Sequence, residues 1–138
     1  MFTMLALLTA GAPDVPIETV AEKAQALFGR DPAFRFEYEV LPFNTQRNLI
    51  LRWKSWTARL FCETAEDDET VAEDSVQIAK ILGKSAPANI ADCTRRVRAV
   101  FYDDPEEQYI DEMVEITSML KQFRGAVVFD PQKKDIVH

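Results

Sequence analysis

The fold is decided by residues 48–62, NLILRWKSWTARLFC. On both sides of Lys54 and Ser55 every second residue is apolar and the residues between them are mixed, which is typical of two strands joined by a tight turn. A two-residue loop at that point pairs Trp53 with Trp56. The next pairs on the same apolar face are Leu51 with Ala58 and Leu49 with Leu60, and the pairs on the opposite, mixed face are Arg52 with Thr57 and Ile50 with Arg59. The stretch therefore predicts an antiparallel hairpin that turns one face, with both tryptophans, toward a hydrophobic core.

The hydrophobic pattern on either side of the hairpin predicts four more strands and three helices. The strands are expected at residues 2–8, 34–40, 95–102 and 126–129, with a turn at Pro42 and Asn44 and a polar tail from Asp130. Amphipathic helices are expected at residues 16–28, from the acidic segment 66–69 to Gly83, and from Asp104 to Gly125. Asp104 is expected to cap the third helix, because Pro105 and Glu107 follow it at the spacing of a helix start.

The element order β-α-β-β-β-α-β-α-β indicates an α+β fold. We expect a two-layer sandwich in which a mostly antiparallel sheet of about six strands carries all three helices on one face. The alternative is an alternating α/β fold with both faces of the sheet covered, but three successive strands with polar alternate faces favour the first. The chain has 138 residues, a length that fits a single domain over residues 1–138.

The chain is acidic, since 23 Asp and Glu residues outnumber 16 Lys and Arg residues and the formal net charge is -7. Nucleic acids and anionic membranes attract positive patches, so this balance argues against both as partners. It favours a basic protein as the partner. The charge balance leaves the oligomeric state open.

The first residues, MFTMLALLTAGAPDVP, are apolar enough to suggest a signal peptide. No lysine or arginine precedes Lys23, so the positively charged start of a signal peptide is missing. The apolar run is also shorter than the ~20 residues of a membrane-spanning helix. We therefore expect a first strand and a cytoplasmic protein. Cys62 and Cys93 fit that compartment as reduced thiols packed in the core.

The sequence holds no motif for catalysis or for a cofactor. Its single histidine is His138, at the last position, so neither Cys62 nor Cys93 has an internal histidine as a base. Two cysteines without an internal histidine fall short of a zinc site, and the acidic segments lack the glycine of a calcium loop. We expect a non-enzymatic protein with no catalytic residues, no metal and no cofactor.

Two acidic segments are the candidate partner-binding surface. They lie where the second and third helices are expected to begin, a position that the helix dipole makes favourable for acidic residues whether or not a partner binds. A basic partner would be attracted to either segment, with Tyr102 or Tyr109 as a nearby aromatic anchor. The candidate acidic residues are Glu66, Asp67, Asp68 and Glu69 in the first segment, and Asp103, Asp104, Glu106 and Glu107 in the second.

Four arginines form the alternative site. The alternation of the strands places Arg52, Arg59, Arg96 and Arg98 on the sheet face opposite the helices. In one interpretation they only form ion pairs with carboxylates on neighbouring strands. In the other they make a recognition surface, or a pocket for a small anion in a small enzyme or binding protein that also uses Glu37 or Glu39.

The C-terminal segment resembles part of several bacterial proteins. A helix that closes with Gly125 and continues as AVVFDPQ is similar to the terminal strand of bacterial α+β families. Some of these families are immunity proteins that neutralise toxins delivered by contact-dependent or type VI secretion systems. The resemblance covers GAVVFDPQ, the acidic, helix-rich layout and the chain size, which amounts to little more than the last third of the chain, and it carries no catalytic residue. It implies a bacterial immunity protein that binds a toxin, and a basic toxin would suit the acidic charge.

Overall fold

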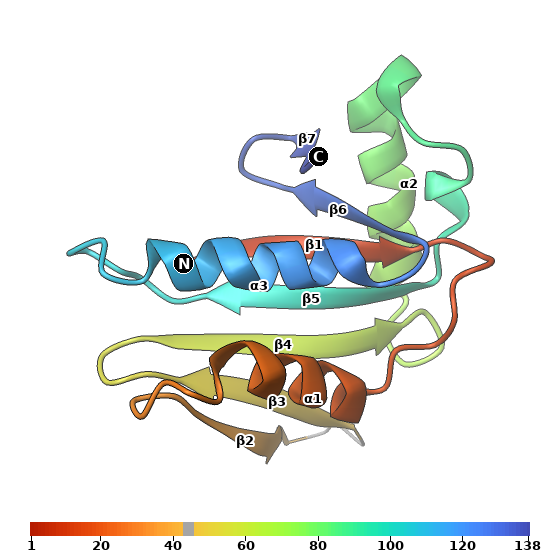
Figure 1. The fold of residues 1–138 in the computed structure, drawn as a ribbon. Helices are drawn as coiled ribbons and strands as arrows, with labels where there is room; N and C mark the ends of the chain where they lie inside the picture. The colour runs from red at the N-terminus through yellow and green to blue at the C-terminus, as the bar shows by residue number, and fades with distance from the viewer. Residues whose placement is uncertain (43–45) are drawn as a thin grey trace.

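Seven strands form one antiparallel sheet in the order β2-β3-β4-β5-β1-β6-β7, and three α-helices pack against it (Figure 1). The computed structural model describes residues 1–42 and 46–138, to which these counts refer. The strands are β1 (Phe2–Leu8), β2 (Arg35–Val40), β3 (Arg47–Arg52), β4 (Thr57–Thr64), β5 (Arg95–Phe101), β6 (Ala126–Asp130) and β7 (Asp135–Ile136). The helices are α1 (Ile17–Phe28), α2 (Thr70–Leu82) and α3 (Ile110–Gln122), with two short 3-10 turns, η1 (Gly83–Ser85) and η2 (Ile90–Asp92). Asn44, where the sequence predicts a turn, lies outside the described residues.

The β3–β4 hairpin has the predicted register. The Trp53 backbone N–H donates to the Trp56 carbonyl at 2.9 Å, which closes the two-residue loop. The two tryptophans are buried on one face of the sheet, with their ring centroids 5.3 Å apart. The pairs that continue this face are Leu51 with Ala58 and Leu49 with Leu60, all of them buried. The prediction of an apolar hairpin face is confirmed, and helices α1 and α3 cover it.

Helix α2 lies on the opposite face of the sheet from α1 and α3. Alternate residues of β1 point into two different cores: Ala6 packs under α1 and α3, whereas Leu5 and Leu7 pack with Ile78 and Leu82 of α2. The sequence predicts all three helices on one face, and the structure differs because β1 is apolar on both faces. With only one face covered, the leucines of β1 would lie in water, so α2 covers them.

The ends of two elements also differ from the prediction. Helix α3 begins at Ile110 rather than beside Asp104, because Glu107 has a positive φ of 54° and interrupts the helix. The Asp104 carboxylate instead accepts the backbone N–H groups of Gln108 and Tyr109, at 3.0 and 2.8 Å, and caps the turn before the helix. The expected polar tail forms β7, which pairs with β6. The α+β class and the antiparallel sheet are confirmed.

Candidate functional site

The four arginines named from the sequence are bound to carboxylates of the same chain. Strand pairing places them on the face opposite α1 and α3, as predicted, and α2 reaches over part of that face. The contacts are Arg52 with Glu37 at 2.7 Å, Arg59 with both oxygens of Glu39 at 3.1 Å, Arg98 with both oxygens of Glu63 at 3.0 and 3.1 Å, and Arg96 with Glu63 at 2.9 Å and Asp74 at 2.7 Å. Each guanidinium therefore already has a carboxylate partner, which gives no support to a small-anion pocket built from these four residues.

The same side chains cover apolar residues of the sheet. The Arg98 guanidinium lies 4.1 Å from the centre of the Phe61 ring, and Phe61 is buried. Burial by itself would lower the pKa of Arg96, but hydrogen bonds with Asp74 and Glu63 raise that pKa above its ordinary value. We call the sheet face that carries Arg52, Arg59, Arg96 and Arg98 the arginine face. These contacts indicate that the arginine face stabilises the sheet.

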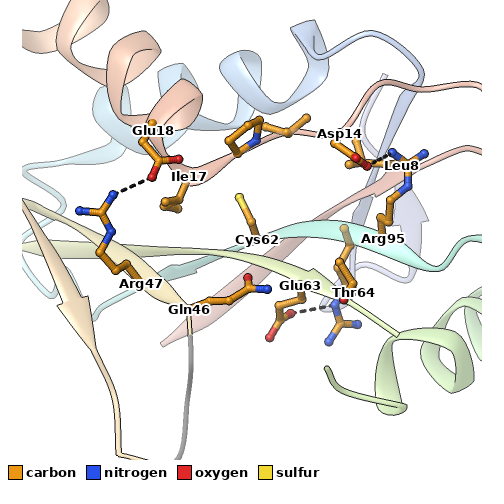
Figure 2. Close-up of a pocket in the computed structure, with 13 residues that line it drawn as sticks. Leu8, Asp14, Ile17, Glu18, Gln46, Arg47, Cys62, Glu63, Thr64 and Arg95 are labelled. Atoms are coloured by element: carbon orange, nitrogen blue, oxygen red, sulfur yellow. Dashed lines mark hydrogen bonds and ion pairs between the residues drawn. The ribbon is translucent and has the colours of Figure 1, made fainter. Parts of the chain in front are cut away.

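A cleft of about 440 Å³ lies between the start of α1, the end of β4 and the start of β5 (Figure 2). Two ion pairs flank it: Arg47 donates to Glu18 at 2.6 Å, and Arg95 donates to Asp14 at 2.8 Å. The Cys62 side chain points into the cleft between them. Burial, and then the charges of nearby glutamates, raises the pKa of the Cys62 thiol to about 12. The thiol is protonated at neutral pH, so the cleft presents paired charges rather than an activated nucleophile.

Both cysteines are free thiols. Cys93 is buried beneath α2, where burial raises its pKa, and Cys62 is half-buried. Among residues 1–42 and 46–138, no three His, Cys, Asp or Glu side chains form a group that could hold a metal ion. No helix in the same part of the chain is long and apolar enough to cross a membrane.

A groove of about 610 Å³ runs along α3, between this helix, the start of β1 and the C-terminal tail; we call it the α3 groove. Ile110 and Val114 line it one helical turn apart, and their exposed fractions are 47% and 59%. Its other apolar residues are Phe2, Met4, Met113 and Val137. The groove therefore presents side chains that water surrounds and that a partner could cover.

The second acidic segment lies at one end of the α3 groove. Four residues predicted from the sequence meet there: Tyr102, Asp103, Asp104 and Glu107. Asp104 is engaged in capping the turn before α3, whereas Asp103 and Glu107 are exposed. Glu106 does not line the groove, and its carboxylate accepts a hydrogen bond from Gln108 at 2.8 Å. The predicted juxtaposition of acidic residues with Tyr102 is therefore present, without Glu106.

Tyr109, the other predicted aromatic anchor, packs against the β3–β4 hairpin. Its hydroxyl lies 3.0 Å from the Ser55 hydroxyl, and its ring stacks on Trp56 with centroids 5.3 Å apart. These contacts fasten the start of α3 to the β3–β4 turn. Tyr109 therefore packs between the start of α3 and the hairpin, in keeping with its place on the buried side of the helix expected from the sequence.

The first acidic segment follows β4, at the opposite end of β5 from Asp103. Asp68 accepts the Thr70 hydroxyl at 2.7 Å and the Thr70 N–H at 3.0 Å, and these hydrogen bonds lower the pKa of Asp68. Asp67 accepts a hydrogen bond from Gln46 at 2.6 Å. Glu66 and Glu69 are exposed. The structure thus separates the two acidic segments, and Asp68 serves the start of α2.

Sequence reasoning missed the exposed apolar residues Ile110 and Val114. A signal was present, because residues four apart share one stripe of a helix, and this stripe lies beside the one that takes Ile116 and Leu120 into the core. Two apolar stripes on one surface helix indicate that one of them is left for another contact.

Comparison with known proteins gives no match: no family model, no curated protein and no solved structure is similar to the chain. The chemistry of the α3 groove and of the sheet face is therefore what bears on function.

Proposed function

We propose that the protein is a non-enzymatic binding protein whose α3 groove receives a basic protein partner. The observation that supports this most strongly is the combination of exposed Ile110 and Val114 with acidic residues at one end of the same groove. An apolar strip fits an apolar anchor on the partner, and the acidic end fits its Lys and Arg residues.

The two parts of the α3 groove act on different stages of binding. Exposed carboxylates such as Glu107 speed the encounter with a basic protein, and the net charge of -7 adds to the attraction. Covering a large apolar side chain such as Val114 contributes up to about 1.5–3 kcal/mol, which mainly slows dissociation. Fast association with the partner and slow dissociation from it thus come from neighbouring residues of the α3 groove.

Toxin neutralisation is the biological role that we propose for this binding. It is supported by the acidic charge and by the resemblance of the C-terminal strand to that of bacterial immunity proteins. That strand is β6, which lies between β1 and β7. Its resemblance therefore concerns the fold, and contact with the toxin is assigned to the α3 groove. An inhibitor of this kind acts by occupying a surface and needs no reaction of its own.

Site-specific crosslinking in the native host tests the proposal. A photoreactive amino acid replaces Val114 in one variant and Ile81 in the control, since Ile81 is 50% exposed on α2, on the other face of the sheet. We expect position 114 to crosslink one basic protein, identified by mass spectrometry, and position 81 not to do so. Crosslinking only from position 81, or from neither position, would overturn the proposal.

A further inference from the structure

Strand β2 is a long free edge of the sheet. It spans six residues and, within residues 1–42 and 46–138, pairs with β3 alone (Figure 1). The other edge is β7, which has two residues. Short edge strands limit pairing with other chains, whereas a long one presents a row of backbone hydrogen-bonding groups. The edge formed by β2 is therefore available to a further strand.

The hairpin register shows which backbone groups of β2 point outward. Trp53 is hydrogen-bonded to Trp56, and alternate residues of β3 from there bond to β4. The intervening residues of β3, such as Arg52 and Ile50, then bond to Arg35 and Glu37 of β2. The outward N–H and C=O groups of β2 are consequently those of Phe36, Tyr38 and Val40. Their side chains share one face, on which Phe36 is 37% and Val40 62% exposed.

Arg35 is the charged residue of this edge for which the described part of the chain provides no ion pair. It is exposed and lies opposite Arg52 across the strands, where like charges repel. Glu37 bonds to Arg52 at 2.7 Å. Arg35 takes part in no ion pair within residues 1–42 and 46–138. A carboxylate from another molecule would give Arg35 an ion-pair partner.

We propose that β2 pairs antiparallel with β2 of a second copy, around a two-fold axis at Glu37. In this register Arg35 faces Glu39 of the second copy, whose carboxylate also accepts hydrogen bonds from Arg59 of its own chain, and Phe36 faces Tyr38 of the second copy. Each aromatic pair exchanges both backbone hydrogen bonds, because the outward groups belong to these residues. The two sheets then continue into one another across the dimer.

Charge disfavours one of the two neighbouring registers, and the cysteine scan below distinguishes the other, in which Phe36 lies on the axis and Arg35 faces Glu37 of the second copy. A shift that placed Tyr38 on the axis would set Glu37 against Glu39 of the second copy, with Arg35 still unbalanced. In the proposed register Glu37 faces its own symmetry mate, and the adjacent Arg52 neutralises each copy. The α3 groove does not include β2, so the dimer leaves the groove open and stands independently of the proposed function.

Analytical ultracentrifugation of charge-reversal variants tests the dimer. The full chain should sediment as a monomer when dilute and approach the mass of a dimer as its concentration rises. Arg35→Glu sets glutamate against Glu39 of the second copy, and Glu39→Lys sets lysine against Arg35, so each variant alone should remain monomeric. An equal mixture of the two should form a heterodimer, because both cross-copy pairs are then attractive. Arg124→Glu, at an exposed position between α3 and β6, is the matched control and should dimerise like the parent. The recovery in the mixture also shows that both variants are folded.

A cysteine scan tests the register. Glu37→Cys should form a disulfide-linked dimer under mild oxidation, since the two copies of residue 37 face each other, and Tyr38→Cys should not. A parent chain that stays monomeric at every concentration, or a dimer that survives Arg35→Glu unchanged, would overturn the proposal. Crosslinking through position 38 instead of position 37 would overturn the register.

Discussion

Oε1 of Glu63 accepts the Nε–H of Arg96 at 2.9 Å, and the Arg96 side chain is only 5% exposed. A guanidinium so far from water requires a carboxylate partner, because an unpaired buried charge is strongly unfavourable. Glu63 also receives Arg98, so one carboxylate holds two strand residues whose positive charges would otherwise repel. This relationship is the reason to regard the arginine face as part of the fold.

Neutralising Glu63 should therefore destabilise the protein. We expect Glu63→Gln to lower the free energy of unfolding by about 3 kcal/mol, because Arg96 keeps only Asp74 as a charged partner. Glu37→Gln is the matched control: the Arg52–Glu37 pair is exposed, and its loss should cost less than about 1 kcal/mol. Urea denaturation of both variants measures the two values. Equal effects would contradict a structural role specific to Glu63.

The hairpin face makes a second prediction about stability. Leu60 is fully buried between α1, α3 and the sheet, so Leu60→Ala should cost about 2–5 kcal/mol. Leu27→Ala, on the exposed side of α1, should cost less than about 1 kcal/mol. A similar loss from both substitutions in thermal or urea unfolding would mean that the core does not lie where the hairpin register places it.

The thiols should be unreactive in the folded protein. Burial raises the pKa of Cys62 to about 12 and also raises that of Cys93, so both remain protonated at neutral pH and should react with iodoacetamide much more slowly than after unfolding. In the unfolded chain a thiol ionises near pH 8.5. Above that pH the unfolded thiols lose protons that the folded thiols keep, which favours the unfolded state. The free energy of unfolding should therefore fall as the pH rises beyond that value. Mass spectrometry of alkylated protein and unfolding at several pH values measure both effects; rapid labelling of the native protein would contradict the burial of these thiols.

The acidic end of the α3 groove should control how fast the partner binds. We expect Glu107→Lys to slow association with the crosslinked partner at low salt, with a smaller effect at high salt, because salt screens exposed charges. Glu69→Lys makes the same charge change at the far end of β5 and should slow association less. Stopped-flow measurements over a salt series separate the two. A larger effect of Glu69→Lys would mean that the partner binds at the first acidic segment instead of the α3 groove.

The sequence was most informative where the pattern is local. Alternation on both sides of Lys54-Ser55 determined the register of β3 and β4, because a two-residue loop permits one pairing that keeps the leucines on one face. It did not show the side on which α2 packs, since helical periodicity indicates the buried stripe but not the sheet face it meets. The apolar residues on both faces of β1 were the available clue.

The site was less accessible to sequence reasoning. The α3 groove combines residues from β1, the segment after β5, α3 and the tail, and their proximity depends on the complete fold. The segment after Asp104 also has the composition of a helix start, although Glu107 takes a left-handed conformation there. The acidic residues were identified, but the apolar strip beside them became apparent only once Ile110 and Val114 were seen to be exposed.

The central claim is that the exposed apolar strip of α3 holds a protein partner. Its most direct test is the dissociation constant of the crosslinked partner, measured by isothermal titration calorimetry for the parent chain, Val114→Ser and the control Ile81→Ser. We predict that Val114→Ser raises the dissociation constant by about tenfold, the equivalent of one buried apolar side chain, and that Ile81→Ser leaves it unchanged. An unchanged dissociation constant for Val114→Ser, or a loss of affinity only with Ile81→Ser, would contradict the account.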